Sequence, residues 1–205
     1  MKELTTTDFQ RMIALAFKNI EARAEEFSKL DAALGDGDHG EAIVMAFSVI
    51  DKTSKSGGDF KKMLSEMGFA VMLETSGSTS TLLGALLLGM SDKVNAVDTI
   101  DADGMREMFR GGLSGVQKNT RAAVGDKTIM DALIPAVEAM EKLKSDDIKE
   151  LLAAAALAAQ IGADATRDMK ATFGRARNLG EKTIGHVDAG ATSWASIFVS
   201  FDQAL

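Results

Sequence analysis

The sequence contains no cysteine and no tyrosine, and it contains a single proline. Without cysteine the chain forms no disulfide and offers no thiolate to a metal ion, and a reducing compartment suits it. Aromatic residues make up only 5% of the chain, so it has little of the aromatic enrichment that strands prefer. Alanine, leucine and methionine recur throughout, and these residues favour helices. The composition therefore predicts an all-α fold.

Basic residues and long apolar runs are also scarce. The chain has 30 acidic and 23 basic residues, a net charge of -7, so nucleic acid and anionic membranes have no general electrostatic attraction to it. Any bound polyanion must therefore be met by local groups. No apolar run reaches the roughly 18 residues of a membrane span, and the first residues are too polar for a signal peptide. We expect a soluble, cytoplasmic protein without nucleic-acid or membrane partners.

Apolar residues recur at three- and four-residue intervals along most of the 205 residues. The first pattern runs from Thr7, the expected N-cap, to Phe27 and marks the buried stripe of one long amphipathic helix. Further patterns cover residues 43–50, 60–72, 82–90, 105–116, 129–143, 146–169 and 191–201. Together they predict about eight helices. Because nothing marks a domain boundary, we expect a single domain over residues 1–205, with glycine- and serine-rich loops at the ends of an antiparallel bundle.

Three carboxylates are concentrated in one short segment, where Asp31, Asp36 and Asp38 share a loop with three glycines and a histidine. Two carboxylates about 4 Å apart repel each other by about 4 kcal/mol at an effective dielectric near 20, so a convergent trio needs protons, water or a cation. The spacing does not fit an EF-hand, and all-oxygen ligands then favour Mg²⁺, which commonly binds together with substrate phosphates. The alternative is a solvated turn, in which Asp and Gly occur for conformational reasons.

Gly35, Gly37 and Gly40 also match the glycine spacing of a dinucleotide-binding fingerprint. That fingerprint must follow a strand and present bare backbone amides to a pyrophosphate. Here the glycines follow a predicted helix, and two aspartates stand among them. We therefore interpret the match as fortuitous.

Two other segments precede predicted helices. Residues 76–81 offer hydroxyls and free amides, which suit either an anion site or an ordinary N-cap. In residues 185–190, Asp188 suits either a cap or an acceptor for a ligand such as a ribose. Arg175 and Arg177 either neutralise phosphate or line a solvated helix end, and His39 is either a phosphoryl acceptor or a hydrogen-bonding group.

Four sequence blocks in this order resemble one known family. They are Leu30-Asp31-x-x-x-Gly35-Asp36-Gly37-Asp38-His39-Gly40, Gly125-Asp126-Lys127-Thr128, Gly174-Arg175-Ala176-x-x-Leu179-Gly180-Glu181 and Gly185-His186-Val187-Asp188-x-Gly190. The chain resembles the DhaL family, the ADP-binding subunits of dihydroxyacetone kinases, over nearly its whole length. The resemblance implies a closed barrel of eight antiparallel helices, with a nucleotide and two Mg²⁺ ions in the loops at one end.

The resemblance also implies which residues bind. The metal ligands would be Asp31, Asp36 and Asp38. The nucleotide would contact His39, Gly40, Glu41, Ala42, Ser78, Thr79, Ile129, Arg175, Asp188, Ala189 and Gly190. Departures from the family pattern occur at residues 76–80, which replace a Gly-Gly-Ala-Ser-Gly stretch, at Ala189, which replaces a proline, and at Thr120, which replaces a glycine.

The family transfers a phosphoryl group from nucleotide to dihydroxyacetone, which a histidine of a separate, DhaK-like substrate-binding subunit holds. In the phosphotransferase-dependent version ADP stays bound as a cofactor and a DhaM-like phosphohistidine subunit recharges it. Three functions stay open: that version, an ATP-dependent kinase subunit for dihydroxyacetone or a short ketose such as erythrulose, and a non-catalytic regulatory nucleotide-binding module. The sequence leaves open whether the chain forms a homodimer.

Overall fold

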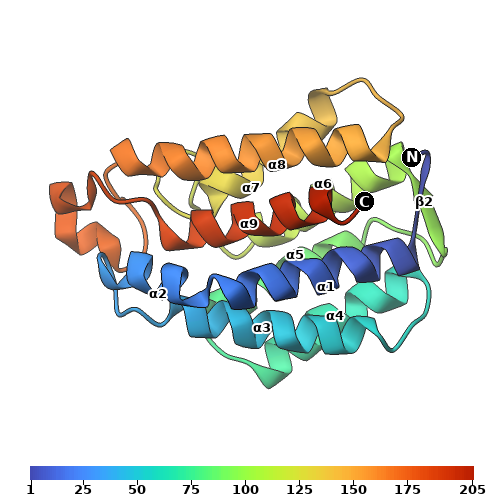
Figure 1. Cartoon of the computed structure of the whole chain (residues 1–205), viewed down its shortest axis with the longest axis horizontal. Helices are drawn as coiled ribbons and strands as arrows, with labels where there is room; N and C mark the ends of the chain where they lie inside the picture. Colours follow the sequence, from blue (N-terminus) through green and yellow to red (C-terminus); the bar gives the residue numbers. More distant parts are fainter.

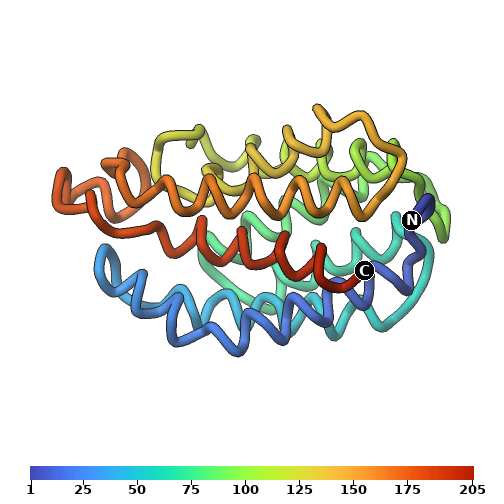
Figure 2. Tube along the Cα trace, turned by 45° about the horizontal axis from the view of Figure 1, so that its top comes forward, coloured from blue at the N-terminus to red at the C-terminus, as the bar shows by residue number.

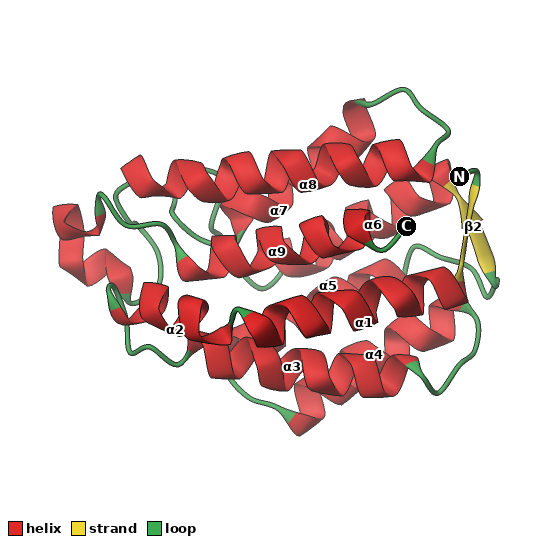
Figure 3. Ribbon diagram, in the orientation of Figure 1, coloured by secondary structure: helices red, strands yellow, loops and turns green.

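The computed structural model describes all 205 residues and is almost entirely helical (Figure 1, Figure 3). The α-helices are α1 (Thr6–Ala22), α2 (Ala24–Ala32), α3 (His39–Ser54), α4 (Phe60–Glu74), α5 (Ser78–Ser91), α6 (Ala102–Gln117), α7 (Met130–Lys142), α8 (Ile148–Ala165) and α9 (Ala189–Gln203). Two 3₁₀ helices, η1 (Thr166–Asp168) and η2 (Ala176–Thr183), and two strands, β1 (Glu3–Thr5) and β2 (Thr99–Asp101), complete the chain. None of the helices is both long and apolar enough to cross a membrane.

The helices form a bundle in which most of them pack against the next in sequence, and α9 packs against α1, α7 and α8 (Figure 2). Helix α9 is buried on most of its sides, and its Trp194, Phe198 and Phe201 belong to a core cluster of 47 buried residues. The all-α prediction is confirmed. The closed barrel that the resemblance implied is not found; the helices form a bundle packed around one continuous apolar core, in which α9 lies between α1 and α8 (Figure 1).

The first helix differs from its prediction at both ends. It begins at Thr6, because Thr5 rather than Thr7 is the N-cap and forms a reciprocal capping box with Asp8. It ends at Ala22, since Arg23 leaves the helical conformation and separates α1 from α2. The break lets the Arg23 guanidinium lie 5.0 Å from the ring centroid of the buried Phe27. The structure therefore has nine α-helices where the periodicity predicted about eight.

The two ends of the bundle are built differently. At one end, near both termini, β1 pairs with β2 in antiparallel register, with Leu4 opposite Ile100 (Figure 1). Sequence periodicity did not predict this pair, because each strand has only three residues. The opposite end carries the α2–α3 loop and the long α8–α9 connection (Figure 1). The segments with the distinctive motifs therefore gather away from the termini.

Candidate functional site

A cleft of about 550 Å³ opens among these loops. Its walls come from α2 and the α2–α3 loop, the first turns of α3, α5 and α9, the α6–α7 connection and residues 173–176. Clefts of this size bind small-molecule ligands and cofactors. Segments that are far apart in sequence therefore form one site.

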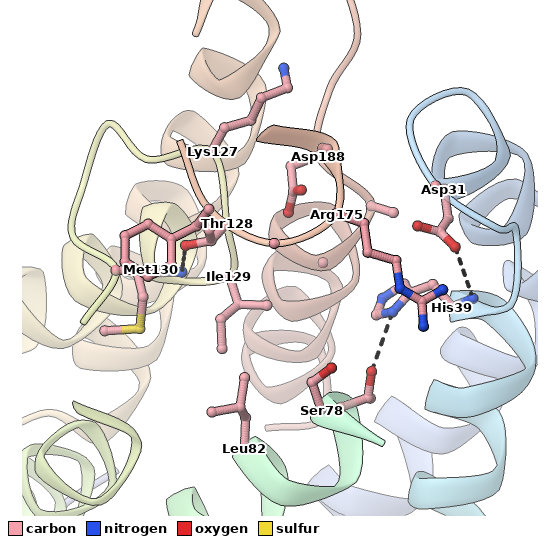
Figure 4. A pocket seen from close by; sticks show the side chains of 18 of the residues that line it. Asp31, His39, Ser78, Leu82, Lys127, Thr128, Ile129, Met130, Arg175 and Asp188 are labelled. Atoms are coloured by element: carbon pink, nitrogen blue, oxygen red, sulfur yellow. Dashed lines mark hydrogen bonds between the residues drawn. The ribbon is translucent and has the colours of Figure 1, made fainter. Parts of the chain in front are cut away.

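The cleft has a polar side and an apolar side (Figure 4). Asp31, His39 and Arg175 lie on one side of the view, and Leu82, Ile129 and Met130 on the other. The apolar wall suits a flat ring, and the polar wall suits a charged group. The cleft thus has the composition expected for a ligand with one apolar and one ionic part.

The three aspartates predicted from the sequence converge. Asp31, Asp36 and Asp38 each offer a carboxylate oxygen, and these oxygens lie within 4.8 Å of one another. Oδ2 of Asp31 accepts hydrogen bonds from the backbone amides of Gly37, at 2.8 Å, and His39, at 3.4 Å, which fold the loop around it. Gly37 has a φ of +79°, which glycine adopts without strain. Clustered hard oxygen donors of this kind fit Mg²⁺.

A cationic side chain from the α8–α9 connection reaches this cluster. Arg175 forms an ion pair through Nη1 with Oδ2 of Asp36. Both side chains are largely exposed, at 73% for Arg175 and 46% for Asp36. The guanidinium therefore partly neutralises the carboxylates in the protein without a ligand.

His39 is held by hydroxyl groups. Its Nε2 lies 2.8 Å from Oγ of Ser193, and its Nδ1 lies 3.5 Å from Oγ1 of Thr79. Burial lowers the pKa of His39, although the charges of Asp31 and Asp38 act in the opposite direction. The lowered pKa favours the neutral imidazole near pH 7, and both ring nitrogens face hydroxyl groups, which favours the interpretation of His39 as a hydrogen-bonding group.

Asp188 caps α9, since its Oδ1 accepts a hydrogen bond of 2.7 Å from the amide of Ala191. Burial raises the pKa of this carboxyl to about 6, and the cap bond and the charge of Lys127 oppose the rise. The side chain also lines the cleft. Asp188 is therefore the cap of α9, and its position in the cleft also suits the second interpretation from the sequence, an acceptor for a ligand.

Lys127 has a structural position that the sequence did not reveal. It is buried, has a φ of +62°, and donates through Nζ to the carbonyl oxygens of Thr166 and His186. Its ammonium group points away from the cleft (Figure 4). Burial lowers the pKa of Lys127. The lysine thus ties the α6–α7 connection to both ends of the 166–186 segment.

Asp131 organises the same connection. It is fully buried and accepts hydrogen bonds from the amides of Gly125, at 2.6 Å, and Thr128, at 2.7 Å. Thr128 in turn lines the cleft. The Gly125–Thr128 block in the sequence indicated this loop, whereas no sequence pattern marked Asn119 and Phe173 as cleft residues.

Most of the predicted contact residues line the cleft: Asp31, His39, Ser78, Thr79, Ile129, Arg175, Asp188, Ala189 and Gly190. Gly40, Glu41 and Ala42 do not. Gly40 is buried under α2, where a Cβ would lie 2.1 Å from the carbonyl oxygen of Ala24. Glu41 and Ala42 line, with Asp38, a neighbouring hollow of about 200 Å³. Gly40 is therefore required for close packing of α3 on α2.

The first turn of α5 faces the cleft with Ser78 and Thr79. Its N-cap is Gly77, and no side chain caps the helix. Of the two alternatives for this segment, the ordinary side-chain cap is not found, because the N-cap is a glycine, which has no side chain. The leading amides of a helix without a side-chain cap are suited to bind an anion.

The comparisons with known proteins agree on one family. The sequence matches the family model described as DAK2 domain over residues 33–203. It is 34% identical over 183 residues to the Listeria innocua PEP-dependent dihydroxyacetone kinase 1, ADP-binding subunit DhaL, covering 88% of this chain and 87% of that one. The corresponding Escherichia coli DhaL subunit is 32% identical over 174 residues, with 83% of each chain covered.

Larger proteins are similar over part of their length. The D-erythrulose kinase of Mycolicibacterium smegmatis is 34% identical over 195 residues, which span 90% of this chain and 34% of that protein. The dihydroxyacetone kinase from C. freundii, solved in complex with AMP-PNP and Mg²⁺, superposes with a TM-score of 0.72 at 22% identity and covers 96% of this chain and 33% of the kinase. The match to the DAK2 model and the extended identity to DhaL subunits agree with the fold and the cleft, and the chain belongs to the DAK2 domain family.

Proposed function

We propose that this chain is the nucleotide-binding subunit of a phosphoenolpyruvate-dependent dihydroxyacetone kinase. The observation that carries the proposal is the convergence of Asp31, Asp36 and Asp38 at the polar side of the cleft, opposite its apolar wall; Asp31 itself lines the cleft. This arrangement suits a nucleotide whose phosphates reach a metal site and whose base lies against Ile129 and Leu82. The similarity to the Listeria and Escherichia DhaL subunits over more than four fifths of each chain supports this assignment.

The metal ligands we propose are the three aspartates, and two Mg²⁺ ions would neutralise the phosphates and the charge that develops during transfer. The leading amides of α5, at Ser78 and Thr79, would hold phosphate oxygens. Arg175 would contact a phosphate from the other side. His39 would donate a hydrogen bond at the start of α3, and Asp188, Ala189 and Gly190 would close against the sugar and base.

Two partner subunits follow from this assignment. We infer a DhaK-like subunit that holds dihydroxyacetone and a DhaM-like phosphohistidine subunit that recharges the bound ADP. The chain would act as one domain over residues 1–205, because one continuous core of 47 residues extends through the bundle. The D-erythrulose kinase matches this chain over only 34% of its length, which supports placing acceptor binding on a different part of the enzyme.

A second candidate is an ATP-dependent kinase subunit for dihydroxyacetone or a related short ketose. The similarity to the D-erythrulose kinase favours it, as does the 30% identity over 186 residues to the human triokinase/FMN cyclase. The two candidates differ in whether the nucleotide stays bound through the reaction cycle.

Native mass spectrometry of protein purified without added nucleotide separates the candidates. We expect one ADP with two Mg²⁺ per chain, retained through extensive dialysis. An empty protein that binds ATP reversibly would favour the ATP-dependent candidate. Absence of any nucleotide affinity in the presence of Mg²⁺ would contradict both and favour a non-catalytic regulatory module.

A further inference from the structure

The segment that carries Arg175 is anchored mainly at its base. The amide of Gly185 donates to the carbonyl of Arg167 at 2.7 Å, and Lys127 holds the carbonyls of Thr166 and His186. Nearer the tip, Thr172 donates to the carboxylate of Asp126. Between residues 173 and 182 the side chains of Arg175, Arg177, Glu181 and Lys182 are exposed.

The ion pair between Arg175 and Asp36 is the one salt bridge that links this segment to the α2–α3 loop. It lies beside the cleft, because Arg175 and Gly35, the residue before Asp36, both line it, and Arg175 lies on the same side of the cleft as Asp31 (Figure 4). Arg177, two residues further on, has no carboxylate within ion-pair distance. The contact therefore depends on one arginine and on one of the clustered aspartates.

A divalent cation and the guanidinium compete for this carboxylate. A cation bound by Asp31, Asp36 and Asp38 would lie beside Nη1 of Arg175, and like charges at that separation repel each other. A nucleotide phosphate would restore the balance, because it accepts hydrogen bonds from the displaced guanidinium. The cation alone thus leaves Arg175 without a partner, whereas cation and nucleotide together leave none of the charges unpaired.

We propose that Arg175 acts as a latch: in the ligand-free protein it takes the place of a cation at Asp36 and so holds the 173–182 segment beside the cleft, and a divalent cation releases it. The inference rests on the proposed metal site. It predicts an unusual order of events: the cation alone loosens the segment, and the cation together with nucleotide closes it again. Mg²⁺ and nucleotide therefore bind with a coupling that depends on Arg175.

Limited trypsin digestion tests the latch on the nucleotide-stripped protein, with cleavage after Lys182 followed by mass spectrometry. Cleavage of a transiently opened segment follows the population of the open form. In the wild-type chain we expect Mg²⁺ alone to accelerate cleavage about two- to fivefold, the range for loss of an exposed ion pair. Addition of ADP with Mg²⁺ should slow cleavage below the rate without ligand.

Two variants with the same loss of charge provide the comparison. In Arg175→Gln the cleavage without metal should already be about two- to fivefold faster than in the wild type and insensitive to Mg²⁺. In Arg177→Gln the wild-type response should persist, because Arg177 has no ion pair to lose. Electrostatic repulsion of the metal by any nearby arginine would instead change both variants alike and overturn the proposal.

Mn²⁺ binding, measured by electron paramagnetic resonance, distinguishes a failure of the latch from a failure of the metal site. If Mn²⁺ binds to the wild-type chain and Lys182 cleavage does not respond to it, the latch is wrong and the metal site stands. If Mn²⁺ binds neither the wild type nor Arg175→Gln, with or without ADP, the metal site and the latch are both overturned.

Discussion

Asp31 links the geometry of the loop to the chemistry of the cleft. Its Oδ2 accepts hydrogen bonds from the backbone amides of Gly37 and His39. The carboxylate therefore fixes the turn that brings Asp36 and Asp38 beside it. Gly35 lies so close that a Cβ at this position would be 2.8 Å from Oδ1 of Asp31. At the scale of single residues, the aspartates therefore need the intervening glycines in order to converge.

Replacement of a metal ligand should separate binding from folding. We expect Asp36→Asn and Asp38→Asn to lower the affinity for Mg–ADP at least about tenfold, because an amide offers Mg²⁺ a weaker, uncharged ligand. Both side chains are exposed, so helicity by circular dichroism should not change. Asp92→Asn, at the far end of α5, is the matched control. Unchanged nucleotide content in both site variants would contradict the metal assignment.

Asp188 should make the stability of the ligand-free protein fall as the pH rises. Burial raises its pKa to about 6, above the value of about 4 for an exposed aspartate, so ionisation in the folded state is unfavourable. Below pH 4 the carboxyl is protonated in both the folded and the unfolded state, and the folded state incurs no cost. Between pH 4 and 6 the unfolded state releases its proton first, and the unfolding free energy decreases by at most about 3 kcal/mol.

Chemical denaturation at a series of pH values, with EDTA present, measures this effect. The wild type should lose stability relative to Asp188→Asn between pH 4 and 7, because the amide keeps an acceptor for the Ala191 cap and does not ionise. A difference between the two proteins that does not vary with pH would show that Asp188 has an ordinary pKa in the folded state.

At the scale of elements, the site depends on connections more than on helices. Asp131 holds the α6–α7 connection by accepting hydrogen bonds from the amides of Gly125 and Thr128. Lys127, in the same connection, holds the α8–α9 connection by donating hydrogen bonds to two of its carbonyl oxygens. Both connections contribute residues to the cleft. Two irregular segments are therefore positioned by buried charged groups, which cost free energy unless they are fully hydrogen-bonded.

Removal of the Lys127 ammonium should loosen the 166–188 segment. Lys127→Met leaves the carbonyls of Thr166 and His186 without their donor, and we expect the unfolding free energy to fall by about 1–3 kcal/mol. Hydrogen exchange at the amides of Gly185 and Asp188 should accelerate. Lys118→Met removes an exposed lysine at the start of the same connection and should change neither quantity. Equal exchange in the two variants would exclude an anchoring function of Lys127.

At the scale of the whole molecule, the two ends of the bundle carry different elements. The β1–β2 pair and both termini lie at the first end, and the cleft lies among the loops at the second (Figure 1). The core between them anchors the helices whose first turns line the cleft. Its largest fully buried side chains include Trp194, which also reaches the cleft from α9.

The chain alone should not phosphorylate dihydroxyacetone. One cleft of about 550 Å³ accommodates a nucleotide, and the proposed function places the acceptor on another subunit. Phosphoryl transfer should therefore appear only after a DhaK-like subunit is added, together with a DhaM-like subunit and a phosphohistidine source or with ATP. The measurement is formation of dihydroxyacetone phosphate in a coupled assay with and without the added subunit. Turnover by the chain alone would contradict the proposed division of functions.

The sequence by itself determined the helical class and most of the helices. Apolar residues at every third or fourth position lie on one face of a helix, and burial of that face stabilises the helix against the core. It also located the aspartate loop, since crowded carboxylates and glycines are a local feature. It did not determine the packing of α9 against α1, α7 and α8 or the buried anchor at Lys127. These depend on contacts between residues far apart in the chain, such as Lys127 with His186, and only the tertiary structure decided them.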